Sequence, residues 1–181
     1  MSSRTGDVLN IEWLFDQLTV ALSARGGEAT DTQTLVGALR YAMLKVRVGS
    51  DVIFDIESSI SLEGNSGPYL QYAHARACSI LKKSTKVAAI DEGTILDEWE
   101  RRLALKISQY EEVVEVAVRE LLPHHITSYL FELAQEFNRF YENSRIIDDH
   151  REEIRLSLVQ AYTKRLSAGL GVLGIPAPDH L

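Results

Sequence analysis

The sequence predicts an all-α protein, a helical bundle with short loops. Apolar residues recur at three- and four-residue steps through almost the whole chain, which is the period of one helix face. The only segment with the character of extended chain, residues 51–55, is short. A length of 181 residues suits a single domain with an ordinary core.

The first two helices are bounded by glycines. A helix is expected from about residue 8 to residue 25, where Gly26 and Gly27 end the apolar pattern. A second helix is expected to continue to Val46, with Thr30 or Asp31 as its cap. After the short extended piece, residues 57–62 are expected to form one or two helical turns.

The next helix has a well-marked start. The segment from Gly64 to Gly67 predicts a loop, and Pro68 stands where a helix favours its first residue. This helix is expected to run to about Lys83, before a polar connector over residues 84–93.

The second half of the chain repeats the helical pattern three times. Thr94 is the expected cap of the first of these helices, with Asp97 approximating a capping box. The apolar spacing over residues 96–121 fits either one long helix or two stacked ones. Residues 126–140 carry one clean apolar face, whereas residues 149–170 are apolar on more than one side, which predicts a last helix buried between its neighbours.

Composition excludes several classes of protein. The hydrophobic content of 45% and the charged content of 25% are typical of soluble globular proteins. No apolar run approaches the roughly 18 residues that a membrane span needs, and the first residues do not form a signal peptide. The single cysteine, Cys78, excludes an internal disulfide and leads us to exclude any cysteine-based zinc site, so a reducing cytoplasm fits.

Residues 64–87, the basic segment, contain no Asp or Glu, although the whole chain has a net charge of −7. Their basic residues are Arg76, Lys82, Lys83 and Lys86. The acidic pI of about 5.2 argues against broad coating by nucleic acid, but charge effects are screened beyond about 8 Å and a focused contact still fits.

Helical spacing places Tyr69, Tyr72 and Arg76 on one line, beside the face that Ala73 and Ala77 would bury. Exposed aromatic rings stack nucleic-acid bases at about 1–3 kcal/mol each, and an arginine one turn away can pair with a phosphate. Alternatively, both tyrosines are residues at the boundary of the core and the arginine is a solvated charge. The residues alone leave these two interpretations nearly even.

Other candidates for chemistry are weaker. His124 and His125 have no carboxylate at ligand spacing and predict surface residues at a helix start, so we expect no metal site. We expect His74 and Cys78 to be structural residues near the core. The acidic pairs are expected on solvated helix faces: Glu111-Glu112, Asp148-Asp149 and Glu152-Glu153. No catalytic triad order, phosphate-binding loop or dinucleotide fingerprint is present in the sequence.

The segment GNSGPYLQYAHARACSIL resembles the C-terminal part of arginyl-tRNA synthetases, which are class I synthetases. Met1-Ser2-Ser3-Arg4 resembles their KMSKS-type signature without its first lysine, and Ser3 stands where many class I enzymes have the second lysine. Gly37-Ala38-Leu39-Arg40 resembles the DALR motif, with glycine in place of aspartate. Residues 137–141 and 170–176 match later signatures, and Leu181 replaces a C-terminal methionine.

This resemblance implies a catalytic-domain tail over residues 1–29 and a helical DALR anticodon-binding domain over residues 30–181. It implies that the domain grips the anticodon stem and loop of tRNA-Arg, with Tyr69 and Tyr72 stacked on splayed bases. The implied contacts to loop backbone or base edges come from Gly64, Asn65, Gly67 and Arg76, with Leu181 at the far end of the site.

The resemblance also implies a parent enzyme that uses ATP, with Mg²⁺, to attach arginine to tRNA-Arg. The signature at Met1, Ser2, Ser3 and Arg4 would stabilise ATP phosphates only when joined to an N-terminal catalytic domain. No Rossmann-type pattern or HIGH-like sequence is present, so we expect this chain alone to bind no cofactor and to activate no arginine. The expected parent is a monomeric cytoplasmic ligase without membrane association. The alternative is a helical protein-interaction module that uses the broad apolar surface of the last helix and binds no RNA.

Overall fold

The computed structural model describes residues 10–24 and 32–180. Within these ranges all regular elements are helices and there is no strand, which confirms the all-α class. The helices are α1 (Ile11–Ala24), α2 (Thr32–Leu44), α3 (Ile56–Ser59), α4 (Gly67–Lys83), α5 (Glu98–Ser108), α6 (Tyr110–Glu120), α7 (His124–Asn143) and α8 (Glu152–Val172). The proposed signature at Met1–Arg4 and the terminal Leu181 lie outside the described residues.

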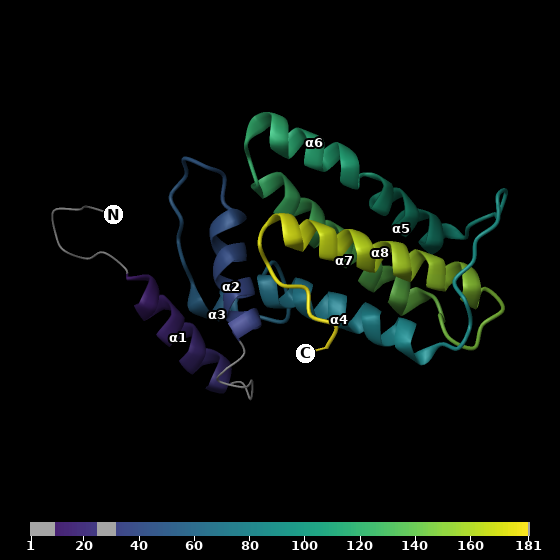
Figure 1. The fold of residues 1–181 in the computed structure, drawn as a ribbon, viewed down its shortest axis with the longest axis horizontal. Helices are drawn as coiled ribbons and strands as arrows, with labels where there is room; N and C mark the ends of the chain where they lie inside the picture. Colours follow the sequence, from purple (N-terminus) through teal and green to yellow (C-terminus); the bar gives the residue numbers. More distant parts are fainter. Residues whose placement is uncertain (1–9, 25–31, 181) are drawn as a thin grey trace.

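Helices α4, α5, α7 and α8 lie side by side along the long axis of the molecule, and α6 follows α5 (Figure 1). Helix α8 packs against α4, α5 and α7, as its apolar residues on several sides predicted. At the centre, the rings of Phe137 and Tyr162 stack with centroids 4.0 Å apart, and both residues are fully buried.

The burial of α8 bears on the protein-interaction alternative. Most of its apolar residues lie in the bundle core, whereas Ile154 is half-buried and Val172 is exposed; the buried ones are Leu156, Leu158, Val159, Leu166 and Leu170. Most of the apolar surface that this alternative requires is therefore inside the molecule.

A second, smaller core joins α1 and α3 to α2 at one end of the bundle (Figure 1). Leu14 and Leu18 of α1 pack into it, together with Leu35 and Leu39 of α2 and Ile60. The described part of residues 1–29 thus docks on the rest of this chain.

Helix α5 starts at a different cap from the expected one. Asp97, not Thr94, is the N-cap: its side chain accepts a hydrogen bond from the Glu100 amide at 2.9 Å, and the Glu100 carboxylate accepts one from the Asp97 amide at 3.0 Å. Thr94 lies in a turn, where its amide donates to the Asp91 carbonyl at 3.1 Å. Asp97 is preferred because a true capping box needs the Glu three residues later.

Helix α8 begins at Glu152 rather than at Asp149. Arg151, the residue before the helix, has φ −101° and ψ +14°, which lie outside the range of an α-helix. The apolar run over residues 96–121 resolves into two helices, α5 and α6, that meet at Gln109.

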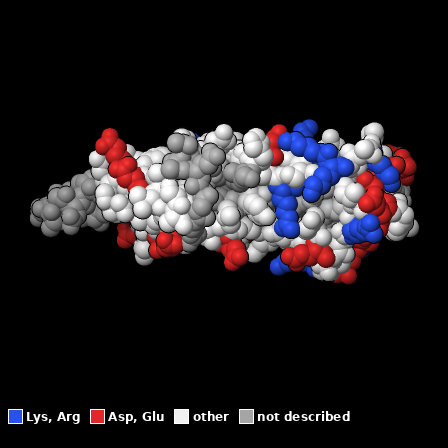
Figure 2. Space-filling model, turned by 90° about the horizontal axis from the view of Figure 1, so that it is seen from below, with Lys and Arg blue, Asp and Glu red and all other residues white. Residues whose placement is uncertain are grey.

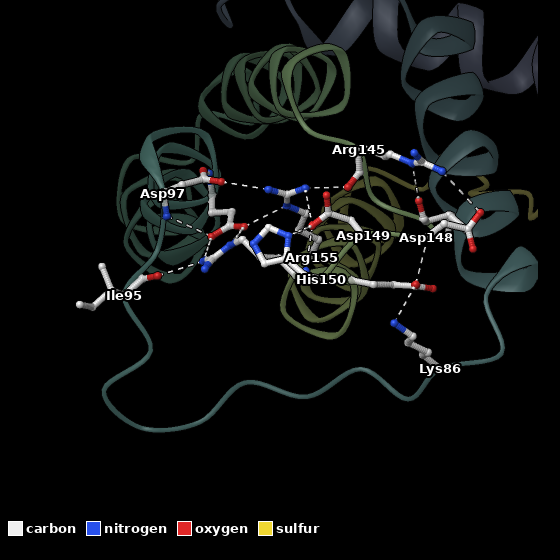
Figure 3. Close-up of polar contacts among 12 residues, drawn as sticks. Lys86, Ile95, Asp97, Arg145, Asp148, Asp149, His150 and Arg155 are labelled. Atoms are coloured by element: carbon white, nitrogen blue, oxygen red, sulfur yellow. Dashed lines mark hydrogen bonds and ion pairs between the residues drawn. The ribbon is translucent and has the colours of Figure 1, made fainter.

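A buried ionic network connects the start of α5 to the start of α8 (Figure 3). Glu100 has a fully buried side chain and accepts hydrogen bonds from Arg151 Nε at 2.8 Å and Arg155 Nε at 3.0 Å. Arg155 also donates to the Arg145 carbonyl at 2.6 Å and pairs with Asp149 at 3.3 Å.

The structure also corrects the expectation that the acidic pairs are solvated. Glu152 is buried, where it accepts from Ser84 Oγ at 2.6 Å and pairs with Lys86 at 3.2 Å. The side chain of Asp149 is 20% exposed and pairs with Arg155, whereas Asp148 and Glu111 are exposed as expected. None of the helices in the described ranges has the length and hydropathy to cross a bilayer.

Candidate nucleic-acid interface

The loop before α4 is held by its own polar groups. Ser66 is the N-cap, and its hydroxyl accepts a hydrogen bond from the Tyr69 amide at 3.1 Å. Gly64 has φ +92° and open space where a side chain would begin, so the turn needs glycine and leaves the backbone accessible.

The other glycine of this loop has a different role from the one expected. Gly67 is buried, and a Cβ there would overlap the Gly37 carbonyl of α2. Gly67 therefore lets α4 and α2 cross closely, and its backbone is not open to a ligand.

Asn65 anchors the loop to α2. Its side-chain oxygen accepts from the Tyr41 hydroxyl at 2.5 Å, and its backbone oxygen accepts from Lys45 Nζ at 3.1 Å. Burial raises the pKa of Tyr41, so the hydroxyl keeps its proton and remains a donor. The side-chain oxygen of Asn65 is thus engaged inside the protein.

The two tyrosines of α4 differ in exposure. Tyr72 has 44% of its surface exposed. Tyr69 is half-buried: its ring meets Phe131 edge-on at 5.7 Å, and its hydroxyl accepts from Asn138 Nδ2 at 2.8 Å. Burial raises the pKa of Tyr69, so this hydroxyl is protonated at neutral pH.

Arg76 lies over the ring of Tyr141 from α7, with its guanidinium carbon 4.2 Å from the ring centroid. Such a cation–π contact holds the guanidinium plane in one place while its outer edge remains available. Arg76 is partly exposed, and Tyr141 has 37% of its surface exposed. Tyr69, Tyr72, Arg76 and Tyr141 together are called the α4 face below.

Two residues of this region, Asn138 and Tyr141, were not among the predicted site residues. Both lie in the FNRFY segment that supported the family resemblance. They are three residues apart on α7, so they share a side of that helix, and this side faces α4. Their spacing was visible in the sequence, but the helix they would face was not.

The basic segment is less cationic in the fold than in the sequence. Lys82 pairs with Asp179 at 3.7 Å and Lys86 with Glu152 at 3.2 Å, carboxylates that come from distant parts of the chain. Figure 2 shows the side of the molecule on which α4 lies, where Lys and Arg gather over one half and acidic side chains lie at their edges. The positive charge is therefore local and bordered by negative charge.

Packing explains why residue 37, in the DALR-like segment, is glycine. A Cβ at Gly37 would overlap the Gln71 side chain, whose Cδ lies 2.7 Å from that position. Gln71 is fully buried, and its Nε2 donates to the carbonyls of Gln33 and Pro176, each at 3.0 Å. An aspartate at residue 37 would displace this link between α2, α4 and the C-terminal tail.

Comparison with known proteins identifies the family. Residues 70–181 match the model of the DALR anticodon binding domain. The chain belongs to the DALR anticodon-binding domain family. The arginine–tRNA ligase of Methanothrix thermoacetophila is 35% identical in an alignment 195 residues long, gaps included, which covers 100% of this chain and 35% of that protein. The ligase of Pasteurella multocida is 36% identical over 93% of this chain and 31% of its own length.

Solved structures agree with the family assignment. The arginyl-tRNA synthetase of Thermus thermophilus superposes with a TM-score of 0.87 at 33% identity, over 98% of this chain and 33% of that one. The Plasmodium falciparum enzyme gives a TM-score of 0.82 at 26% identity, over 94% of this chain and 33% of its own. These matches confirm the resemblance to arginyl-tRNA synthetases. This DALR-family chain spans about a third of the length of these relatives.

Proposed function

We propose that this chain is the anticodon-recognising part of an arginine–tRNA ligase, and that the α4 face binds the anticodon loop of tRNA-Arg. The observation that carries the proposal is the half-exposed ring of Tyr72, one helical turn from a guanidinium that is stacked on Tyr141. Unpaired loop bases can splay out, stack on such rings and be read on their edges.

The four residues of the α4 face have different roles in this proposal. Tyr72 has the more exposed ring and supplies the main stacking surface. Tyr69 is fixed by Phe131 and Asn138, so it offers a ring edge and a protonated hydroxyl. Arg76 turns its outer nitrogens to a phosphate or a base edge. The open backbone at Gly64 can approach the RNA closely.

The test compares two exposed aromatic residues on different helices. Tyr72→Ala should weaken tRNA-Arg binding by about 1–3 kcal/mol, roughly 5- to 150-fold, because one stacking partner is lost. Trp13→Ala on α1 is the matched control, since Trp13 is 46% exposed and Tyr72 is 44% exposed. Fluorescence anisotropy with labelled tRNA-Arg and an unrelated tRNA, at one salt concentration, measures both. Wild-type affinity in Tyr72→Ala would refute the stacking role.

Binding should also weaken as salt rises, with a modest slope. Each neutralised phosphate contributes to that slope. Arg76 is the one cation of the α4 face, and Lys82 and Lys86 of the basic segment pair with carboxylates. A steep slope would point to a broad electrostatic contact instead of a focused one.

The remaining proposals concern the whole protein. We propose that residues 1–29 belong to the tail of the catalytic domain and residues 30–181 to the anticodon-binding domain. A monomeric cytoplasmic ligase would supply the catalytic domain as partner and use ATP with Mg²⁺ to attach arginine. The 181-residue chain alone should give no arginine-dependent ATP–pyrophosphate exchange. Measurable exchange would contradict this division of labour.

A further inference from the structure

Three potential metal ligands converge where α4 meets the C-terminal tail, residues 175–180. His74 and Cys78 are one helical turn apart on α4, and Asp179 comes from the tail. Cys78 Sγ lies 3.6 Å from Asp179 Oδ1, 3.8 Å from His74 Nδ1 and 3.9 Å from His74 Nε2. One ligand atom from each of the three residues lies within 4.8 Å of the other two.

The hydrogen bonding of His74 determines which of its ring nitrogens can bind a cation. His74 is only 3% exposed, and its Nδ1 is 2.9 Å from the Pro178 carbonyl oxygen. A carbonyl oxygen can only accept, so Nδ1 carries the hydrogen and Nε2 carries a lone pair. Metal-binding histidines commonly donate their other ring nitrogen to a backbone carbonyl in this way, which selects the tautomer.

The spacing of the three groups is close to that around a tetrahedral ion. Zinc–sulfur and zinc–nitrogen bonds of about 2.3 Å and 2.0–2.1 Å place sulfur and nitrogen about 3.5 Å apart at a tetrahedral angle. The observed Sγ–Nε2 distance of 3.9 Å and Sγ–Oδ1 distance of 3.6 Å are close to this value, but Sγ is also 3.8 Å from Nδ1, so the His74 ring must turn before its Nε2 lone pair points at the ion. We propose that His74, Cys78 and Asp179 form a three-ligand site for Zn²⁺ or a chemically similar ion, with water as the fourth ligand.

The ligand types favour such an ion over the hard cations. A thiolate and an imidazole suit Zn²⁺, whereas Mg²⁺ and Ca²⁺ require mostly oxygen ligands. The bound ion would fasten the tail to α4, next to the hydrogen bond that Gln71 Nε2 makes to the Pro176 carbonyl. From the sequence we excluded a cysteine-based zinc site because the chain has one cysteine, and the sequence could not show that Asp179, 101 residues away, lies beside Cys78.

The experiment uses Co²⁺ and Zn²⁺ on the reduced, chelator-treated chain. Co²⁺ should bind with one equivalent and give the thiolate-to-cobalt charge-transfer absorption that only a cysteine ligand produces, and Zn²⁺ should displace it. Asp179→Asn should weaken Zn²⁺ binding by at least about 10-fold, because the substitution removes one ligand. Asp179 is exposed, so the variant should keep the fold. Cys78→Ser should abolish the absorption band.

Two controls distinguish this site from cobalt bound elsewhere on the chain. Lys82→Met removes only the ion pair to Asp179 and should keep the band and the affinity. A second place where cobalt could bind is the stacked pair His124 and His125, where Glu120 lies 2.9 Å from His125 Nε2. Cobalt bound there would give no thiolate band and would remain bound in Cys78→Ser. Zn²⁺ should also slow amide exchange in the tail of the wild type, but not in Asp179→Asn. A missing thiolate band, or equal affinity in Asp179→Asn and the wild type, overturns the proposal.

Discussion

Glu100 should contribute strongly to stability, although it lies on α5, away from the proposed RNA face on α4. Its carboxylate is fully buried and held by Arg151 and Arg155. Removing one partner of a buried ionic cluster typically costs about 3–5 kcal/mol, because the remaining charges stay buried without compensation. We expect Glu100→Gln to lower the free energy of unfolding by this amount at pH 7.

The lowered pKa of Glu100 predicts a contribution of similar size to the free energy of unfolding. Burial alone would raise it, but hydrogen bonds from Arg151, from the Asp97 amide and from Arg155 outweigh burial and lower the pKa from 4.5 to about 2. A difference of this size between the folded and unfolded chain corresponds to about 3 kcal/mol. Because the folded-state pKa is depressed, the contribution is complete above pH 4.5 and is lost as the pH falls toward 2.

Urea denaturation between pH 7 and pH 3 measures this contribution as a difference between the wild type and Glu100→Gln. Other carboxylates with lowered pKa values, such as Asp149 and Glu152, titrate in both proteins and largely cancel in the difference. The difference should fall from about 3 kcal/mol at neutral pH to about 1.4 kcal/mol at pH 3.

The matched control is Glu111→Gln, whose exposed carboxylate pairs with Arg165 on the surface. It should change stability by less than about 1 kcal/mol at any pH in this range. A Glu100→Gln difference that is below about 1 kcal/mol at pH 7, or that does not change with pH, would refute the reasoning.

Three further perturbations test the packing and the α4 face. Gly37→Ala should lower stability by about 1–3 kcal/mol in urea denaturation, because the new methyl group displaces Gln71; an unchanged stability would show that Gln71 can move freely. Phe137→Ala should cost about 3–5 kcal/mol, since its fully buried ring is replaced by a cavity, and a loss below about 1 kcal/mol would contradict this core assignment. Tyr141→Ala should weaken tRNA-Arg binding by about 0.5–2 kcal/mol with little change in Tm, because Arg76 loses its support; anisotropy that matches the wild type would argue against that support.

Local features of the sequence predicted α4 well. The glycine-rich loop, Pro68 and the apolar spacing mark its start and its buried side without any knowledge of the neighbouring helices. The same spacing placed Tyr72 beside the buried face, and in the structure 44% of its surface is exposed. The predicted cap of α5 was three residues too early, because both Thr94 and Asp97 satisfy the sequence rule and only Asp97 has a glutamate at the third position of the helix.

Contacts between distant segments could not be predicted in the same way. Periodicity indicates that Gly67 is near a helix start, but not that α2 crosses there and buries it. It places Glu152 in an acidic pair, but not beside Ser84 and Lys86, which approach from a loop 68 and 66 residues earlier in the chain.

The sequence by itself determined the helical class, the family and the line of tyrosines on α4, because helix period, caps and motifs are local properties of the chain. Only the tertiary structure decided which side chains surround that helix. It brought Tyr141 under Arg76, and it brought Asp179 to Cys78 and Lys82. Packing between helices sets these approaches, and it depends on the shapes of all the surfaces that meet in the core.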